Sequence, residues 1–177
     1  MTSSLTTYTA LLRAVNVGGT GKLPMTELKA MCESAGFGNV RTYIASGNVL
    51  FNSALTEAAV RQLLNEQLLA YAGKPVGVLV RSAAEMAAVL AANPFPDVPG
   101  NRVVAIFLDA AAPPDALAAA VGQQNELMAL GTREIYVHYG DGMADSKLRI
   151  PAAKAGTARN MNTVAKLAGL AGMAGLS

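Results

Sequence analysis

The residues of this sequence that are best suited to chemistry lie in a glycine-rich, basic segment near its N-terminus. An apolar run over residues 8–16 leads into residues 17–23, Val-Gly-Gly-Thr-Gly-Lys-Leu, and Pro24 follows them. Such a segment can hold an anion, because a lysine and the free backbone N–H groups at a helix start both attract negative charge. It lacks the first glycine and the Ser or Thr of a phosphate-binding P-loop, so a looser anion site and a plain strand-to-helix turn both stay open.

A second polar segment, residues 157–164, lies near the C-terminus. Arg159 and Asn160 could contact a ligand or fix the loop through hydrogen bonds, and Asn162 or Thr163 could cap the last helix. Arg13 lies on a predicted strand face beside apolar residues, so it needs a carboxylate, several carbonyls or an anionic ligand. The residues that would form an anion site are Arg13, Asn16, Gly18, Gly19, Lys22, Ser46, Asn48, Arg159 and Asn160.

Catalytic chemistry has weaker support in this sequence. Ser46 lies in the segment 45–48, Ala-Ser-Gly-Asn, whose residue types also suit a plain turn. His138 is the one histidine and alternates with apolar residues, which is typical of a strand surface, and no Gly-x-Ser-x-Gly elbow accompanies it. Ser146 and Lys147 are adjacent, and adjacent residues rarely present both groups to one substrate. An enzyme that uses Ser46 or His138 is therefore an alternative hypothesis.

The composition indicates a folded, cytoplasmic protein without a metal or cofactor. Apolar residues make up 52% and charged residues 15% of the 177 residues, which is enough for a sizeable core. Cys32 is the only cysteine, so no internal disulfide can form, a reducing compartment is expected, and one histidine cannot complete a zinc site with it. We expect neither a signal peptide nor a membrane span, and the sequence leaves the oligomeric state open.

The net charge of +2 is unevenly distributed along the chain. Residues 1–81 carry a net charge of +3, residues 82–142 one of −5 and residues 143–177 one of +4. Basic regions attract phosphates or nucleic acid, although basic segments packed against the acidic middle would give the same pattern. Ferredoxin-like sheets can stack bases on exposed aromatic rings, for which Tyr43 and Phe51 are candidates, but no RNA-recognition string is present. A module that binds single-stranded nucleic acid or a protein is a third hypothesis.

The hydrophobic pattern predicts the elements that position these residues. In the first half it predicts strands over residues 8–16, 41–44, 49–51 and 76–80. One helix is predicted to begin at Pro24, and a second to bury a face that includes Val60, Leu64 and Tyr71. Residues 1–81 therefore follow the order β-α-β-β-α-β of a ferredoxin-like module.

Residues 82–177 predict a second, incomplete module packed on the first. Ser82 and Glu85 have the spacing of a capping box at the start of a helix. The pattern then predicts strands over 103–108, 126–130 and 135–139, a short alanine-rich helix between Pro113 and Gly122, and a last helix over 163–170. We therefore predict an α+β fold of two ferredoxin-like (split βαβ) modules with antiparallel sheets covered by helices.

Five strings in the sequence resemble those of one bacterial family. They are Leu-Leu-Arg-Ala-Val-Asn-Val-Gly-Gly (11–19), Arg-Thr-Tyr-Ile-Ala-Ser-Gly-Asn-Val (41–49), Val-Leu-Val-Arg-Ser (78–82), Ala-Asn-Pro-Phe (92–95) and Thr-Ala-Arg-Asn-Met-Asn-Thr-Val (157–164). Together they resemble the domains of unknown function numbered 1697, which implies the same two-module fold and no particular activity. The sequence departs from the family pattern at Ala14, where Gly is expected, and at Met161, where Trp is expected, which weakens any stacking role there.

Binding of a small anionic ligand, most simply a phosphorylated one, is the leading hypothesis. Arg13, Lys22 and Arg159 would supply the positive charge, and Asn16 and Asn160 would orient the ligand. The hypothesis requires these groups to lie within about 15 Å of one another, the span of a single pocketed ligand.

Overall fold

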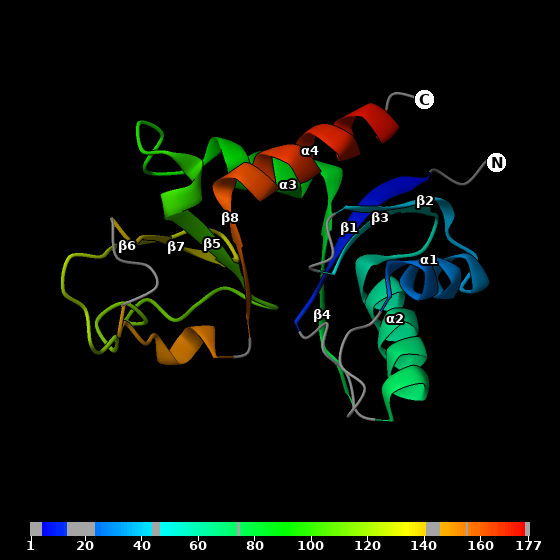
Figure 1. Ribbon diagram of the computed structural model, residues 1–177, viewed down its shortest axis with the longest axis horizontal. Coiled ribbons are helices and arrows are strands. Elements are labelled where there is room, and N and C mark those ends of the chain that lie inside the picture. Colours follow the sequence, from blue (N-terminus) through cyan, green and yellow to red (C-terminus); the bar gives the residue numbers. More distant parts are fainter. Residues whose placement is uncertain are drawn as a thin grey trace. The chain divides into compact units, whose positions relative to one another are not determined.

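The protein forms two compact units, each with one four-stranded antiparallel sheet (Figure 1). The N-terminal unit comprises residues 1–86 and 167–177, and the central unit comprises residues 87–166. The structure is a computed structural model, and it describes residues 5–13, 24–43, 47–73, 75–140, 146–154 and 156–175. No helix within these ranges combines the length and the apolar character that crossing a membrane requires.

The sheet of the N-terminal unit, here the first sheet, has the strand order β2-β3-β1-β4. All neighbouring strands are antiparallel, so each helix connects two parallel strands that are separated by one strand. This is the split βαβ arrangement that the element order of the sequence predicts. The elements are β1 (Thr6–Leu12), α1 (Met25–Ser34), β2 (Gly38–Tyr43), β3 (Asn48–Ser53), α2 (Glu57–Ala72) and β4 (Val78–Ser82).

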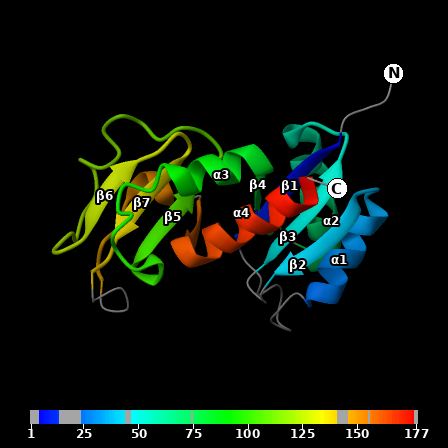
Figure 2. The same ribbon diagram turned by 90° about the horizontal axis from the view of Figure 1, so that it is seen from above.

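α1 and α2 lie on one face of the first sheet because each helix presents an apolar stripe to it (Figure 2). Val60, Leu64 and Leu68 recur along one side of α2 and are buried, whereas Tyr71, predicted for the same stripe, is 45% exposed. The helices and alternate strand residues form a single apolar core. It includes Tyr8, Ala10, Leu12, Leu28, Met31, Cys32, Val49, Phe51, Val78 and Val80.

The opposite face of the first sheet is also buried, and it is more polar. The strand register places Arg41, Leu50, Thr9 and Arg81 in one row across the four strands. Thr9, Leu50 and Arg81 are at most 1% exposed, and Arg41 Nη2 donates a 3.1 Å hydrogen bond to the carbonyl of Leu170. For the residues that the structure describes, Thr9 Oγ1 and Arg41 Nε are the buried side-chain polar atoms without a hydrogen-bond partner.

The sheet of the central unit, here the second sheet, has the order β6-β7-β5-β8, which repeats the strand order of the first. Its strands are β5 (Val103–Phe107), β6 (Leu127–Leu130), β7 (Glu134–His138) and β8 (Thr157–Asn160), and β5 follows a short 3₁₀ turn, η2 (Gly100–Arg102). The sequence predicts three of these strands and not β8. That strand, Thr-Ala-Arg-Asn, lies at the sheet edge and lacks the apolar alternation by which strands are recognised.

Turns and a 3₁₀ helix replace the crossover helices in the central unit. The predicted alanine-rich helix is wrong, since residues 114–119 form successive hydrogen-bonded turns, such as Ala116 N to Pro113 O at 2.9 Å. A segment this short does not offset the cost of helix nucleation, even when it is rich in alanine. The turns and the 3₁₀ helix η4 (Pro151–Ala153) cover an apolar cluster on one face of the second sheet, formed by Val104, Ile106, Leu108, Ile135, Val137 and Ile150.

The division between the two units falls within the helices α3 (Ala83–Ala91) and α4 (Met161–Gly175). Each helix directly follows the edge strand of a sheet, α3 after β4 and α4 after β8. The predicted capping box begins α3, because Ser82 Oγ accepts from Glu85 N at 3.2 Å and Glu85 Oε1 accepts from Ser82 N at 2.8 Å. The α+β fold with two antiparallel sheets is therefore confirmed, while the module boundary at residues 81 and 82 stays a prediction.

Candidate functional site

Three segments of the N-terminal unit meet at one end of the first sheet, which we call the loop end. Leu12 N donates a 3.0 Å hydrogen bond to the carbonyl of Gly47, which directly precedes β3. Arg13 N donates a 3.0 Å hydrogen bond to the carbonyl of Gly77, which directly precedes β4. The end of β1 and the starts of β3 and β4 are thereby joined, and each belongs to or adjoins one of the strings singled out in the sequence.

Arg13 is exposed at the loop end, which corrects the expectation that it lies on a buried strand face. β1 ends at Leu12, so Arg13 is the first residue beyond the paired part of the strand. Its side chain lies against Gly77, where a Cβ atom would be 2.9 Å from Arg13 Cδ. Gly77 also has φ +85°, a conformation that strains other residues, so both backbone and space require glycine there. Gly77 is not among the predicted site residues, although it falls inside the predicted strand 76–80, where a glycine is a signal of a bulge or a close backbone approach.

Asn48 lies at the same end and holds the β2–β3 hairpin. Its side chain is fully buried, and Asn48 Nδ2 donates a 3.0 Å hydrogen bond to the carbonyl of Tyr43. Gly47, with φ +80°, supplies the left-handed conformation of the turn. The structure therefore gives Asn48 a structural role in the turn. The predicted site residues Asn16, Gly18, Gly19, Lys22 and Ser46 lie outside the described residues.

Arg159 and Asn160 lie together at the junction of β8 and α4 in the central unit. Asn160 Oδ1 accepts a 2.9 Å hydrogen bond from Thr163 N, so Asn160 is the residue that caps α4, rather than Asn162 or Thr163. Arg159 Nη1 donates to Thr157 Oγ1 and to the carbonyl of Ala158, both at 2.9 Å. Arg159 is half-buried, and this burial lowers the pKa of its guanidinium to about 10, so it stays protonated at neutral pH.

The junction of β4 and α3 repeats this arrangement in the N-terminal unit. Arg81 precedes the capping residue Ser82, as Arg159 precedes the capping residue Asn160. Arg81 Nη1 donates to the carbonyl of the preceding residue, Val80, at 3.1 Å, as Arg159 does to its own preceding residue. The two strings share only the arginine and a capping residue type, so the sequence does not show this repetition.

The structure thus brings Arg13 and Asn48 together at the loop end, and Arg159 and Asn160 together at the start of α4. The first pair belongs to the N-terminal unit and the second to the central unit. The convergence of Arg13, Lys22 and Arg159 on one ligand stays a prediction.

The residues of the catalytic alternative have ordinary structural surroundings where they are described. His138 is half-buried on β7, with its ring centroid 5.5 Å from that of Phe95. The hydroxyl of Ser146 donates to Glu126 Oε2 and accepts from Leu148 N, so it fixes a loop instead of pairing with a lysine. Burial raises the pKa of the Cys32 thiol to about 12, which keeps it an unreactive core residue.

The two aromatic rings on which the nucleic-acid alternative depends are not both exposed. Phe51 is 1% exposed and stacks on Phe37 in the core, with ring centroids 4.3 Å apart. Tyr43 is half-buried on β2, an edge strand of the first sheet. A single half-buried ring does not form the stacking platform that such sheets use for bases.

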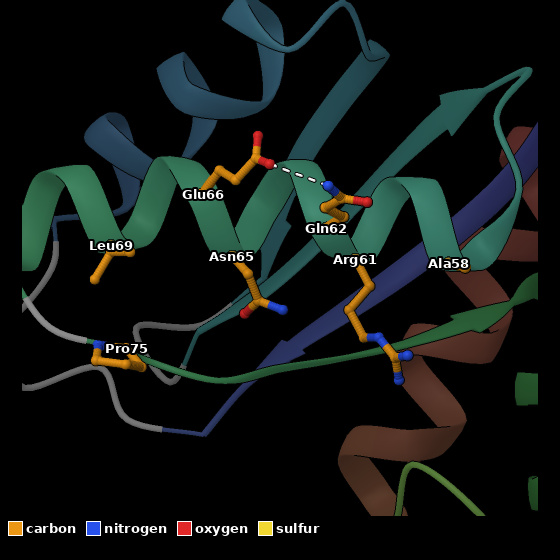
Figure 3. Close-up of a pocket in the computed structure, with 7 residues that line it drawn as sticks. All are labelled: Ala58, Arg61, Gln62, Asn65, Glu66, Leu69 and Pro75. Carbon is orange, nitrogen blue, oxygen red and sulfur yellow. Dashed lines mark hydrogen bonds between the residues drawn. The ribbon is translucent and has the colours of Figure 1, made fainter.

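A groove of about 540 Å³ runs along α2 (Figure 3). Arg61, Asn65 and Leu69 project on the side of Pro75, while Gln62 and Glu66 form a 3.2 Å hydrogen bond on the helix. Its walls are one helix and one proline, so few polar groups converge there and it is a weaker candidate than the loop end. In the described part of the chain, no cluster of three or more His, Cys, Asp or Glu could hold a metal ion.

Comparison with known proteins connects this fold to one family. The family model described as "Protein of unknown function (DUF1697)" matches residues 5–136, which confirms the resemblance found in the sequence motifs. Among solved structures, the conserved bacterial protein SP0830 from Streptococcus pneumoniae is similar at 22% identity with a TM-score of 0.75. The alignment covers 95% of this chain and 99% of that chain, so the two share a fold over their whole length. No curated protein matches the sequence.

Proposed function

We propose that this protein, which belongs to the DUF1697 family, binds a small anionic ligand with a phosphate-like group at the loop end of its first sheet. The observation that carries the proposal is the meeting of three chain segments around the exposed Arg13. Hydrogen bonds from Leu12 N and Arg13 N to Gly47 and Gly77 hold the backbone of these segments in place. Because this backbone is already ordered, binding of a ligand would have to order only the side chain of Arg13.

Arg13 supplies the charge and the geometry that a phosphate-like group needs. A guanidinium presents several N–H donors in one plane and can bind two oxygens of the same group. Gly77 supports this role, because its missing side chain leaves room for the aliphatic part of Arg13. The residues that follow in the sequence would complete the site with backbone N–H groups, amide groups and a second cation. They are Asn16, Gly18, Gly19 and Lys22 from the same segment, and Ser46 from the chain between β2 and β3.

Arg159 and Asn160 form the second part of the proposed site. Partial burial disfavours the charged form of Arg159, and a bound anion would reverse this effect and raise the pKa again. Its bonds to Thr157 and Ala158 hold the guanidinium on β8, the strand that leads directly into α4. The N-terminus of a helix favours an anion. Asn160 uses Oδ1 for the cap, so only its Nδ2 group is available to a ligand.

Thermal unfolding of the full chain against inorganic phosphate, nucleotides, sugar phosphates and short oligonucleotides tests the proposal. A ligand at about 100 times its dissociation constant adds about 2.7 kcal/mol of stability, which raises the melting temperature by several degrees. Loss of a charged hydrogen-bond partner costs about 1.5–3 kcal/mol, so Arg13→Ala should weaken binding by roughly 10- to 100-fold.

Arg149→Ala is the matched control, because Arg149 is an exposed cation outside the five motif strings. It should leave the ligand-induced shift unchanged, while Arg13→Ala and Arg159→Ala reduce it. Equal shifts in all three variants would show that the ligand binds elsewhere. A response to oligonucleotides alone would favour the nucleic-acid alternative, and turnover of a phosphorylated compound that is lost in His138→Ala would favour the enzyme.

The proposal includes a cytoplasmic location. Its basis is the single cysteine, which cannot form an internal disulfide and which is buried in the core.

A further inference from the structure

The groove along α2, here the α2 groove, reaches the loop end of the first sheet. Figure 3 shows Pro75 beside Leu69 at one end of this groove and Ala58 at the other. Pro75 precedes Gly77 by two residues, and the carbonyl of Gly77 accepts the hydrogen bond from Arg13 N. Two residues of chain span at most about 7 Å. The α2 groove and the proposed anion site are therefore neighbours within the N-terminal unit.

The chain between the α2 groove and the loop end has Pro75 and Gly77 on its outer side. Val76 lies between them and is buried in the apolar core, whereas Pro75 is exposed and Gly77 is half-buried. The aliphatic part of Arg13 lies over Gly77, where a Cβ atom would be 2.9 Å from Arg13 Cδ. Because residue 77 has no side chain, a ligand held by the guanidinium of Arg13 can extend past Pro75 into the α2 groove.

Three side chains of α2 form a row along the α2 groove. Arg61, Asn65 and Leu69 are four residues apart, so they are neighbours on the helix surface. The row is about 12 Å long, because an α-helix rises 1.5 Å per residue. Leu69 is 47% exposed and lies nearest to Pro75, followed by Asn65 and then Arg61 (Figure 3). The groove is therefore apolar beside the loop end and polar farther along the helix.

The size and the chemistry of the α2 groove suit the body of an organic phosphate. Its volume of about 540 Å³ lies within the range of about 300–1,000 Å³ that is usual for small-molecule sites. Leu69 and Pro75 offer apolar contact to a flat ring. Asn65 is exposed, and its amide can both donate and accept hydrogen bonds. Inorganic phosphate or a short-chain phosphate ester would leave this space unused.

We propose that the ligand of the loop end is a mononucleotide, with its phosphate on Arg13 and its nucleoside in the α2 groove. This inference rests on the proposed function, because Arg13 holds the phosphate group. A nucleoside combines apolar ring faces, which would pack on Leu69 and Pro75, with polar ring edges and hydroxyl groups, which would bond to Asn65. The α2 groove therefore determines the substrate class, and Arg13 supplies the affinity that all phosphate esters share.

Binding of the four common ribonucleoside monophosphates and of methyl phosphate to the full chain tests this inference by calorimetry. At least one nucleotide should bind roughly tenfold or more tightly than methyl phosphate, because its nucleoside buries apolar surface. Leu69→Ala and Asn65→Ala should each weaken nucleotide binding about 3- to 10-fold and leave methyl phosphate binding unchanged. Leu55→Ala is the matched control, because Leu55 is 41% exposed in the same unit and lies outside the α2 groove. It should change neither affinity.

The variant Arg13→Ala separates a failure of this inference from a failure of the proposed function. It should weaken nucleotides and methyl phosphate alike. If the two kinds of ligand bind equally and both depend on Arg13, the proposed function stands and the inference is wrong. A preference for nucleotides that persists in Leu69→Ala and Asn65→Ala would also overturn it, since the nucleoside would then lie elsewhere. If no binding depends on Arg13, the inference and the proposed function are both wrong. Both groove variants change exposed side chains, so their melting temperatures without ligand should match that of the unchanged chain.

Discussion

Replacement of Thr9 by valine should stabilise this protein. Thr9 lies in the middle of β1, is fully buried, and its hydroxyl has no hydrogen-bond partner among the described residues. Valine has nearly the same shape and replaces the hydroxyl with a methyl group. The change therefore removes an unsatisfied polar group from the interior without leaving a cavity.

The expected change in the free energy of unfolding follows from the cost of burying a hydroxyl group. Mutational data put this cost at about 1–3 kcal/mol when no hydrogen bond compensates for it. Valine also favours strand conformation, so Thr9→Val should gain about 1 kcal/mol or more in the free energy of unfolding. For a chain of this length such a gain raises the melting temperature by roughly 2–4 °C.

Urea denaturation of the two variants Thr9→Val and Thr7→Val provides the measurement and its control. Thr7 lies two residues earlier on the same face of β1, and its hydroxyl donates a 2.9 Å hydrogen bond to Asn52 Oδ1. Thr7→Val should therefore lose about 1 kcal/mol, the opposite sign. If Thr9→Val destabilises the protein to the same extent, the hydroxyl of Thr9 has a partner and the reasoning is refuted.

Three further variants follow from single contacts. Ser146→Ala removes the hydrogen bond that contributes most to lowering the pKa of Glu126. A lowered pKa stabilises the fold at pH values above the usual glutamate pKa. Ser146→Ala should therefore lower the free energy of unfolding, measured by urea denaturation, more at pH 7 than at pH 3. Equal losses of unfolding free energy at the two pH values would contradict this. Gly77→Ala, at φ +85°, should cost about 1–3 kcal/mol in thermal unfolding. Asn160→Ala should cost about 1 kcal/mol through loss of the α4 cap, while Asn162→Ala should cost little.

The sequence predicts the N-terminal unit well because its elements carry strong local patterns. Alternating apolar residues define the strands, and the recurring leucines of α2 define a helix that ends at Gly73 in the left-handed conformation. The end of β1 is different, because a strand ends where its partners end. Leu11 pairs with Asn48 and Leu12 with Val78, the first residues of β3 and β4, so pairing stops one residue before Arg13. No local pattern within residues 8–16 contains that information.

In the central unit, by contrast, local sequence patterns do not predict the structure of two segments. Its alanine-rich segment has a high helix propensity, and yet it forms turns that cover the apolar cluster of the second sheet. β8 has a weak strand pattern, and yet it pairs with β5 from Val104 to Phe107. Tertiary contacts decide both outcomes, because each segment completes a sheet or a core that is built from distant residues.

The sequence predicts the polar residues of the candidate site, but it does not predict which of two similar arginines is accessible to a ligand. Arg159 and Asn160 stand out as polar residues beside a helix start, but the same two features describe Arg81 and Ser82, which were not predicted as site residues. Both arginines donate to the carbonyl of the preceding residue, and burial distinguishes them: Arg81 is 1% exposed and Arg159 is half-buried. A fully buried guanidinium cannot reach a ligand that arrives from solvent, so the same local arrangement stabilises the fold in one unit and leaves a cation within reach of an anion in the other.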